Sequence, residues 1–117
     1  MKGTKRVALV GAALSDIGRV DTKTPYELHY QAASRAIADA GLTIGDIDGI
    51  IPPPGFTTSE ELAANLGIDD LRVATTVHMG GASPTASLQH AALAMLAGIA
   101  TNVLVVIGWH GYAAFRP

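Results

Sequence analysis

The sequence predicts an α/β protein in which helices cover both faces of a mostly parallel β-sheet. Short apolar runs that suit strands alternate with longer segments that suit helices, in the order β-α-β-α-β-α-β. The strand segments are apolar almost throughout, which is typical of parallel strands buried on both faces. The 117 residues carry no internal repeat, so the length suits one domain.

The first strand is predicted over residues 6–14, a continuous apolar run. A helix follows at Thr24, which can cap it, since Pro25 suits the first helical position and Glu27 can complete a capping box. Gly41 ends this helix as a left-handed cap would. Apolar residues that recur every three or four positions predict one buried stripe: Tyr26, Tyr30, Ala33, Ile37 and Ala40.

A short second strand is predicted over residues 47–51 and is stopped by the three prolines that follow it. Thr58 and Glu61 can form a second capping box, which opens a short helix that ends near Leu66. The third strand runs from Leu71 to Val77 and is rich in β-branched residues.

The third helix begins at Ser83-Pro84 and is closed by Gly98, and a fourth apolar strand covers residues 103–107. This helix is unusual because it consists almost entirely of Ala, Leu and Met. Its polar positions are Thr85, Ser87, Gln89 and His90. A surface helix would show a broader polar face, so we expect this helix to be buried nearly all round, beneath a second α/β layer.

The composition indicates that part of the apolar surface is buried, and it excludes several classes of function. A hydrophobic fraction of 49% and a mean hydropathy of +0.31 are high for a small protein. We therefore expect part of the surface to be buried against a partner chain or a further part of the same protein. The net charge of −2 and the pI near 6.0 argue against a nucleic-acid binder. The absence of cysteine excludes a disulfide, a thiolate metal site and a cysteine nucleophile within these residues.

The start of the chain suits a buried strand better than a signal peptide. Its apolar run is short, contains Gly11 and continues into Ser15 and Asp16. No stretch reaches the roughly 20 apolar residues of a membrane helix, so a cytoplasmic protein is expected. Gly11 also invites a dinucleotide-binding interpretation, but the next glycine is Gly18, so the G-x-G-x-x-G spacing is absent.

Five segments resemble a known family, the thiolases. Residues 36–42 and 46–51 look like the first helix and second strand of thiolases. Residues 77–83, 91–98 and 103–108 resemble the nucleophile turn, the central helix and the strand after it. The resemblance is closest to the branch of sterol-carrier-protein thiolases and lipid-transfer proteins. It implies an αβαβα layered fold, in which the central helix is sandwiched between two similar halves.

The same resemblance implies that residues 1–117 are a partial N-terminal domain of a longer chain, because family members are several times longer. The chain also stops at Pro117, just after a predicted strand and without a closing helix. The later motifs that carry the remaining chemistry of thiolases have no counterpart in these residues.

Gly81 occupies the position at which thiolases carry their nucleophilic cysteine. Glycine cannot form an acyl-enzyme, so covalent thiolytic transfer is excluded at this position. Some lipid-transfer-type members lack the cysteine and cleave aldol adducts of acyl-CoA thioesters, for example from steroid side chains, often with a small OB-fold partner protein. The resemblance therefore implies retro-aldol cleavage of a β-hydroxyacyl-CoA, with a coenzyme A thioester as substrate and no tightly bound cofactor.

Two alternatives remain open at this stage. One is an acetyl-CoA acetyltransferase-like enzyme with its cysteine elsewhere in a longer chain. The other is a non-catalytic subunit of a complex that binds acyl-CoA or lipid. Thiolases dimerise through the strand before the nucleophile turn, so the resemblance also implies a homodimer through the strand from Leu71 to Val77.

The candidate site residues gather around the turn before the third helix. The backbone N–H groups of Gly80 and Gly81 could hold a thioester oxygen at a helix N-terminus, or the turn could simply need flexible backbone. Ser83 could donate a hydrogen bond in the pocket, although the position suits an N-cap. His78 and His110 each follow a predicted strand end, where sites of α/β proteins gather, but either could be packed or face solvent.

Other chemistries find less support in the sequence. His29 and His90 lie within predicted helices and are expected to be structural. None of the 4 histidines has a metal-ligand spacing with carboxylates, so no metal site is predicted. Residues 81–85 lack the second glycine of the hydrolase nucleophile elbow, which argues against a serine hydrolase.

Overall fold

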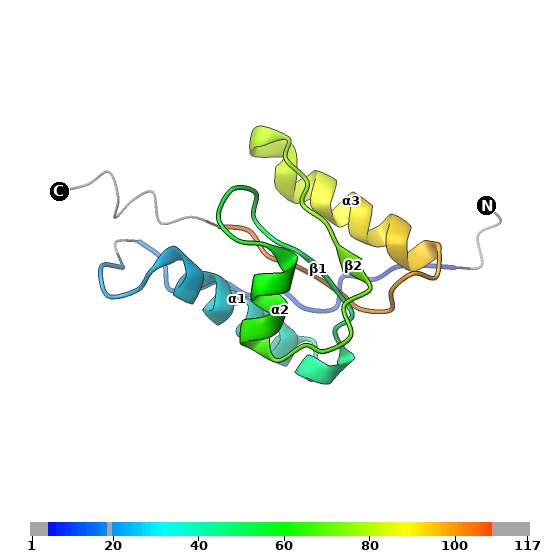
Figure 1. Cartoon of the computed structure of the whole chain (residues 1–117), viewed down its shortest axis with the longest axis horizontal. Coiled ribbons are helices and arrows are strands. Elements are labelled where there is room, and N and C mark those ends of the chain that lie inside the picture. Colours follow the sequence, from blue (N-terminus) through cyan, green and yellow to red (C-terminus); the bar gives the residue numbers. More distant parts are fainter. Residues whose placement is uncertain (1–4, 19, 109–117) are drawn as a thin grey trace.

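The computed structural model describes residues 5–18 and 20–108, which form a small parallel sheet flanked by helices (Figure 1). In chain order the main elements are α1 (Pro25–Asp39), β1 (Gly49–Ile51), α2 (Ser59–Leu66), β2 (Val73–Ala74), α3 (Ser83–Leu96) and β3 (Val103–Val105). Two 3₁₀ turns, η1 (Ile44–Asp46) and η2 (Gly80–Ala82), precede β1 and α3.

The sheet has β1 at its centre, with β2 and β3 on either side, and both neighbours run parallel to it. Gly49 stands opposite Val73 in β2 and Val103 in β3. A Cβ atom at Gly49 would lie 3.0 Å from side-chain atoms of both valines. The predicted parallel α/β fold is thus confirmed.

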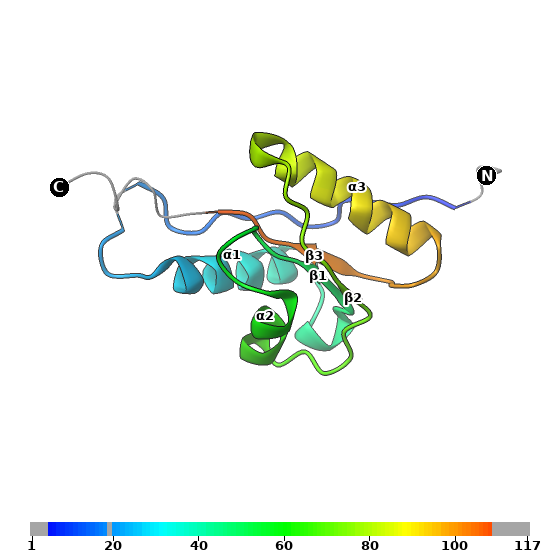
Figure 2. The ribbon, with the colours of Figure 1, turned by 45° about the horizontal axis from the view of Figure 1, so that its top comes forward.

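Alternate side chains of the strands serve two separate cores, as the pleat of a strand requires. Ile50 and Leu104 point toward α1 and α2, where they pack with Ile37 and Leu62. Ile51 points to the opposite face and packs with Ala91 of α3 and with Val77, which lies between β2 and η2. Figure 2 shows α3 on one side of the sheet and α1 and α2 on the other.

The predicted N-cap bonds of the first two helices form, but the glutamates do not complete capping boxes, since the carboxylates of Glu27 and Glu61 accept the hydroxyls of Thr24 and Thr57 instead. The Thr24 hydroxyl accepts the N–H of Glu27 at 3.2 Å, and the Thr58 hydroxyl accepts the N–H of Glu61 at 3.1 Å. Gly41 adopts a φ of +71° just after α1. Such short-range signals need only local backbone geometry to act.

The buried stripe of α1 differs from the expected one at its first turn. Ala33 and Ile37 are buried as predicted, but Tyr26 is 44% exposed. His29 takes the buried position instead, with 2% exposure. The stripe therefore runs through residues 29, 33 and 37, each separated by about one helical turn, and leaves Tyr26 outside it.

The predicted first strand over residues 6–14 does not join the sheet. No strand is assigned between residues 5 and 18, and Leu9 and Leu14 are 76% and 73% exposed. This segment instead lies along α1, where a Cβ atom on Gly11 would stand only 2.6 Å from the carbonyl oxygen of Ala36. An apolar run shows a preference for burial, but a strand forms only where another backbone is available to pair with it.

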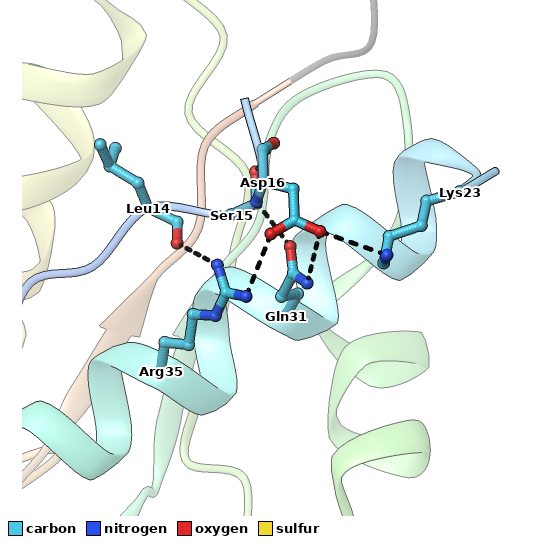
Figure 3. A network of polar contacts seen from close by, with 6 residues as sticks. All are labelled: Leu14, Ser15, Asp16, Lys23, Gln31 and Arg35. Atoms are coloured by element: carbon cyan, nitrogen blue, oxygen red, sulfur yellow. Dashed lines mark hydrogen bonds and ion pairs between the residues drawn. The ribbon is translucent and has the colours of Figure 1, made fainter. Parts of the chain in front are cut away.

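A polar network fastens the end of this segment to α1 (Figure 3). Asp16 accepts hydrogen bonds from Gln31 and Arg35, both at 3.1 Å, and pairs with Lys23 at 3.2 Å. Arg35 also donates to the carbonyl oxygen of Leu14 at 3.0 Å. These partners lower the pKa of Asp16 to about 2, with the hydrogen bond from Gln31 as the largest cause.

Helix α3 is buried on one side only, so the expectation of burial nearly all round is not met by the described residues. Ser87 and Ala91 face the sheet, whereas Leu88 and Leu93 are 44% and 57% exposed. The described residues supply one layer beneath this helix, and one layer covers only one face. No helix in the described residues is long and apolar enough to cross a membrane.

Candidate functional site

The carboxyl ends of the three parallel strands point to one edge of the sheet, and the candidate site lies there. The loop after β1 leads through Pro52 to Phe56, the segment after β2 leads through Val77 to η2, and β3 leads to Gly108. In Figure 1 these three exits and the amino end of α3 lie toward the same side of the molecule. Ligands of parallel α/β proteins bind at this edge.

Ser83 holds the turn that precedes α3. Its hydroxyl oxygen accepts the N–H of Met79 at 2.8 Å, and the side chain is 5% exposed. The N–H of Ala82 donates to the carbonyl oxygen of Met79 at 3.1 Å and closes the 3₁₀ turn. The predicted N-cap role is therefore corrected: Ala82 is the N-cap, and Ser83 is the first helical residue because the extra 3₁₀ turn moves the helix start.

Gly80 and Gly81 are exposed at this turn, but only one of them requires glycine for its backbone. Gly80 has a φ of +57°, a conformation that side chains disfavour, whereas Gly81 does not have a positive φ. A Cβ atom added at Gly81 would meet nothing within 4 Å. The position could carry a side chain, and in this chain the space is left open in front of the amino end of α3.

The turn can offer a partial positive charge to a bound oxygen. The aligned peptide dipoles of α3, which is 14 residues long, place their positive end here. The backbone N–H groups of Gly80 and Gly81, two exposed residues, are the predicted donors toward such an oxygen. Their role as donors stays a prediction.

The structure brings His78 to the same turn, between buried Val77 and exposed Met79, and leaves its side chain exposed. His110 lies outside the described residues. His90 is exposed on α3. Of the predicted site residues, His78, Gly80, Gly81 and Ser83 thus share one turn. In residues 5–18 and 20–108 no three His, Cys, Asp or Glu side chains gather in a way that could hold a metal ion.

One buried histidine at the same edge was expected to be merely structural. His29 is 2% exposed, and its Nε2 atom lies 2.8 Å from the carbonyl oxygen of Gly108. Its ring meets the rings of Tyr26 and Phe56 edge-on, at centroid distances of 6.5 Å and 6.1 Å. Burial lowers the pKa of His29, and the hydrogen bond to Gly108 opposes that effect. The one-turn spacing from Ala33 and Ile37 is the sequence signal that marks it as buried.

An open hollow of about 490 Å³ lies at the opposite edge, among the loops that lead into the strands. Its lining includes Asp46, Asp48 and Asn102. Both carboxylate oxygens of Asp48 are already used, since they accept the N–H groups of Thr101 and Asn102 at 2.9–3.0 Å. The hollow is therefore a structural junction between loops, and the candidate site remains at the carboxyl edge.

Sequence comparison finds two relatives, although no family model matches the chain. The 17-hydroxy-3-oxo-4-pregnene-20-carboxyl-CoA lyase of Mycobacterium tuberculosis is 33% identical over 112 residues, which are 95% of this chain and 29% of the relative. The steroid side-chain-cleaving aldolase of Thermomonospora curvata is 34% identical over 98 residues, which are 83% of this chain and 25% of the relative.

Solved structures show the same fold. The Ltp2-ChsH2(DUF35) aldolase superposes with a TM-score of 0.85 and 28% identity, over 91% of this chain and 28% of that one. A cysteine-to-serine variant of Xanthomonas campestris OleA, solved with bound lauric acid and lauroyl-CoA, gives a TM-score of 0.67 over 76% of this chain and 28% of OleA. At 22% identity, the likeness to OleA concerns the fold alone.

The chain thus spans 25–29% of the length of the relatives and structures that it matches. The order of its segments, its parallel sheet and its turn before α3 agree with the family to which the sequence is similar. The chain belongs to the thiolase superfamily, in the branch of the thiolase-like aldolases, and corresponds to one segment of those longer proteins.

Proposed function

We propose that the protein cleaves a carbon–carbon bond of a β-hydroxyacyl-CoA by a retro-aldol reaction. The observation that carries this proposal is the open space at Gly81, the position of the thiolase nucleophile, in a turn whose backbone would accept a side chain. A chain without a nucleophile at this point can still hold a thioester oxygen. It cannot form a covalent acyl-enzyme there.

The reaction requires a base and an oxyanion site. A base removes the proton of the β-hydroxyl group, a carbonyl forms at that carbon, and the bond between the α and β carbons breaks. The electron pair moves into the thioester, which becomes an enolate until it is protonated. The N–H groups of Gly80 and Gly81 at the amino end of α3 are the proposed donors to the enolate oxygen.

The named activities of the relatives support a coenzyme A thioester with a steroid-type acyl group as the substrate class. One relative is a pregnene-carboxyl-CoA lyase and the other is a steroid side-chain-cleaving aldolase. We extend this activity to the present protein as a proposal, because the chain covers 29% and 25% of these relatives.

Two partners belong to the same proposal. The name of the solved Ltp2-ChsH2(DUF35) aldolase gives two components. It supports the proposal that the present protein also acts with a small partner protein. We propose an OB-type fold for that partner. A second copy of the protein is proposed to pair along β2, because β2 forms an edge of the described sheet. An unpaired edge strand offers free N–H and C=O groups to another chain.

The proposal is tested with the complete protein, assayed alone and with its partner, on β-hydroxyacyl-CoA thioesters that include a steroid side chain. The expected products are a carbonyl compound and a shortened acyl-CoA, with no acyl group on the protein by intact mass. Thiolysis of acetoacetyl-CoA with a covalent acyl-enzyme would instead favour an acetyltransferase. Tight thioester binding without turnover would favour a non-catalytic binding subunit.

A further inference from the structure

The imidazole of His29 is a buried polar group with one nitrogen unused. Its Nε2 atom lies 2.8 Å from the carbonyl oxygen of Gly108, whereas its Nδ1 atom is buried and has no hydrogen-bond partner among the described residues. Buried polar atoms are nearly always paired, so an unpaired one in a side chain that is 2% exposed requires an explanation.

The contact with Gly108 determines which nitrogen of the neutral ring carries the proton. A carbonyl oxygen can only accept, so Nε2 must be the donor. The neutral ring has one N–H group, and Nδ1 is therefore left as an acceptor. Burial favours this neutral form and lowers the pKa of His29, because the charged ring would lose its solvation in the interior.

The position of the ring associates it with the candidate site. Gly108 follows β3 and Phe56 follows β1, so His29 lies among chain segments that leave the carboxyl edge of the sheet. The turn with Gly80 and Gly81 follows β2 at the same edge. The ring of Tyr26, which is 44% exposed, meets the imidazole edge-on.

The missing partner must be a hydrogen-bond donor. A bound water would need two to four polar partners, but two of the neighbours of the ring are the aromatic rings of Tyr26 and Phe56. An anion or a ligand carbonyl would meet a lone pair and be repelled. A neutral hydroxyl group fits, because it brings its own donor and can sit against aromatic surface.

We propose that Nδ1 of His29 accepts a hydrogen bond from the hydroxyl group of an acyl substrate bound at the carboxyl edge of the sheet. This inference rests on the proposed function and adds a residue that recognises the hydroxyl group. The hydrogen bond from Nε2 to Gly108 fixes the tautomer of the ring and the direction in which Nδ1 points. His29 is then a specificity-determining residue for hydroxylated over non-hydroxylated acyl chains.

The test compares two ligands on two proteins. The complete protein and its His29→Gln variant are titrated with a β-hydroxyacyl-CoA and with the same acyl-CoA lacking the hydroxyl group. Glutamine can still donate to the Gly108 carbonyl oxygen; with its amide nitrogen there, its oxygen lies on the side of the ring's Cδ2 atom, so no acceptor remains at the position of Nδ1. We expect the wild type to bind the hydroxylated ligand about five- to tenfold more tightly, which is the difference in affinity that one hydrogen bond provides. The variant should lose this preference and bind the other ligand as the wild type does.

His90→Gln, a change at an exposed histidine of α3, is the matched control and should keep the preference. Retention of the preference by His29→Gln would overturn the inference while leaving the proposed function intact. A wild type that binds neither thioester would overturn both.

A second measurement does not depend on the folding of a variant. In the wild type labelled with ¹⁵N-histidine, the hydroxylated ligand should shift the Nδ1 resonance of His29, and the other ligand should not. Equal shifts with both ligands would contradict the proposed hydrogen bond.

Discussion

The carboxylate of Asp48 accepts the N–H of Asn102 at 2.9 Å and thereby ties the start of β1 to the start of β3. The same carboxylate accepts the N–H of Thr101 at 3.0 Å through both of its oxygens. A single side chain before the central strand thus fixes where its neighbour begins. The register of the sheet depends on this junction as well as on the strands themselves.

Asp48→Asn is expected to destabilise the protein, because the N–H groups of Thr101 and Asn102 lose a negatively charged acceptor and Thr101 also loses its second acceptor oxygen. The loss should be about 1–2 kcal/mol in the free energy of unfolding, as for one or two charge-assisted hydrogen bonds. Chemical denaturation measures it. Asp69→Asn, in an exposed loop, is the control and should change stability little. Equal stability of both variants would show that the junction is dispensable.

Gly11→Ala is expected to loosen the segment that lies along α1. The new Cβ atom would stand 2.6 Å from the carbonyl oxygen of Ala36 and 2.8 Å from the Cβ of Ala40, so the backbone must move. The cost should be about 1–3 kcal/mol, as for other overpacked contacts. Hydrogen exchange of residues 5–18 should rise. Gly45→Ala is the comparison, since its nearest contact would be 3.8 Å away; similar exchange in the two variants would contradict the close packing.

Asp16→Asn should reveal a pH-dependent contribution to stability. The pKa of Asp16 is lowered from 3.8 to about 2, so its ionised form is favoured in the folded state. The stabilisation is therefore complete above about pH 4 and is lost as the pH falls through about 2. The difference in melting temperature between wild type and variant should shrink over that range. It should also be small at high salt, because the carboxylate is partly exposed; a difference that is undiminished at pH 2 would refute this interpretation.

Gly80→Ala and Gly81→Ala should differ in stability although the residues are adjacent. Gly80 has a φ of +57°, so alanine should cost about 1 kcal/mol there, while Gly81 is unstrained and its alanine variant should lie within about 0.5 kcal/mol of the wild type. In the complete protein, Gly81→Ala should still reduce thioester cleavage, because the methyl group enters the space left open at the turn. If a folded Gly81→Ala variant cleaved the thioester as fast as the wild type, the open space at the turn would not be part of the proposed site.

Local signals in the sequence predicted the helices well. Thr24 and Thr58 each have an acidic residue three positions later, and both caps form. Gly41 and Gly98 follow helices with φ values of +71° and +77°. Each of these features acts within one turn of backbone, so no distant residue is needed to interpret it.

Sequence signals are less informative where a distant partner decides the outcome. The run over residues 6–14 is apolar enough for a buried strand, yet none of the described strands pairs with it. The small and apolar residues of α3 predict a cover on every side; Leu93 is 57% exposed in the described residues, so the second layer expected above this helix stays a prediction. The burial of His29 agrees with the structural role expected for it, but its contact with Gly108 spans 79 positions and could not be predicted from local spacing.

The central place of β1 also has a consequence for synthesis. β1 is the first of the described strands to leave the ribosome, yet both of its neighbours come later, the last of them at Val103. Until then Ile50 and Ile51, both fully buried in the folded chain, have no completed layer on either side. The nascent chain therefore carries β1 unpaired until Val73 and Ala74 have been made, and with one open edge until Val103–Val105 follow, so its yield in the cell depends on how well that interval is protected.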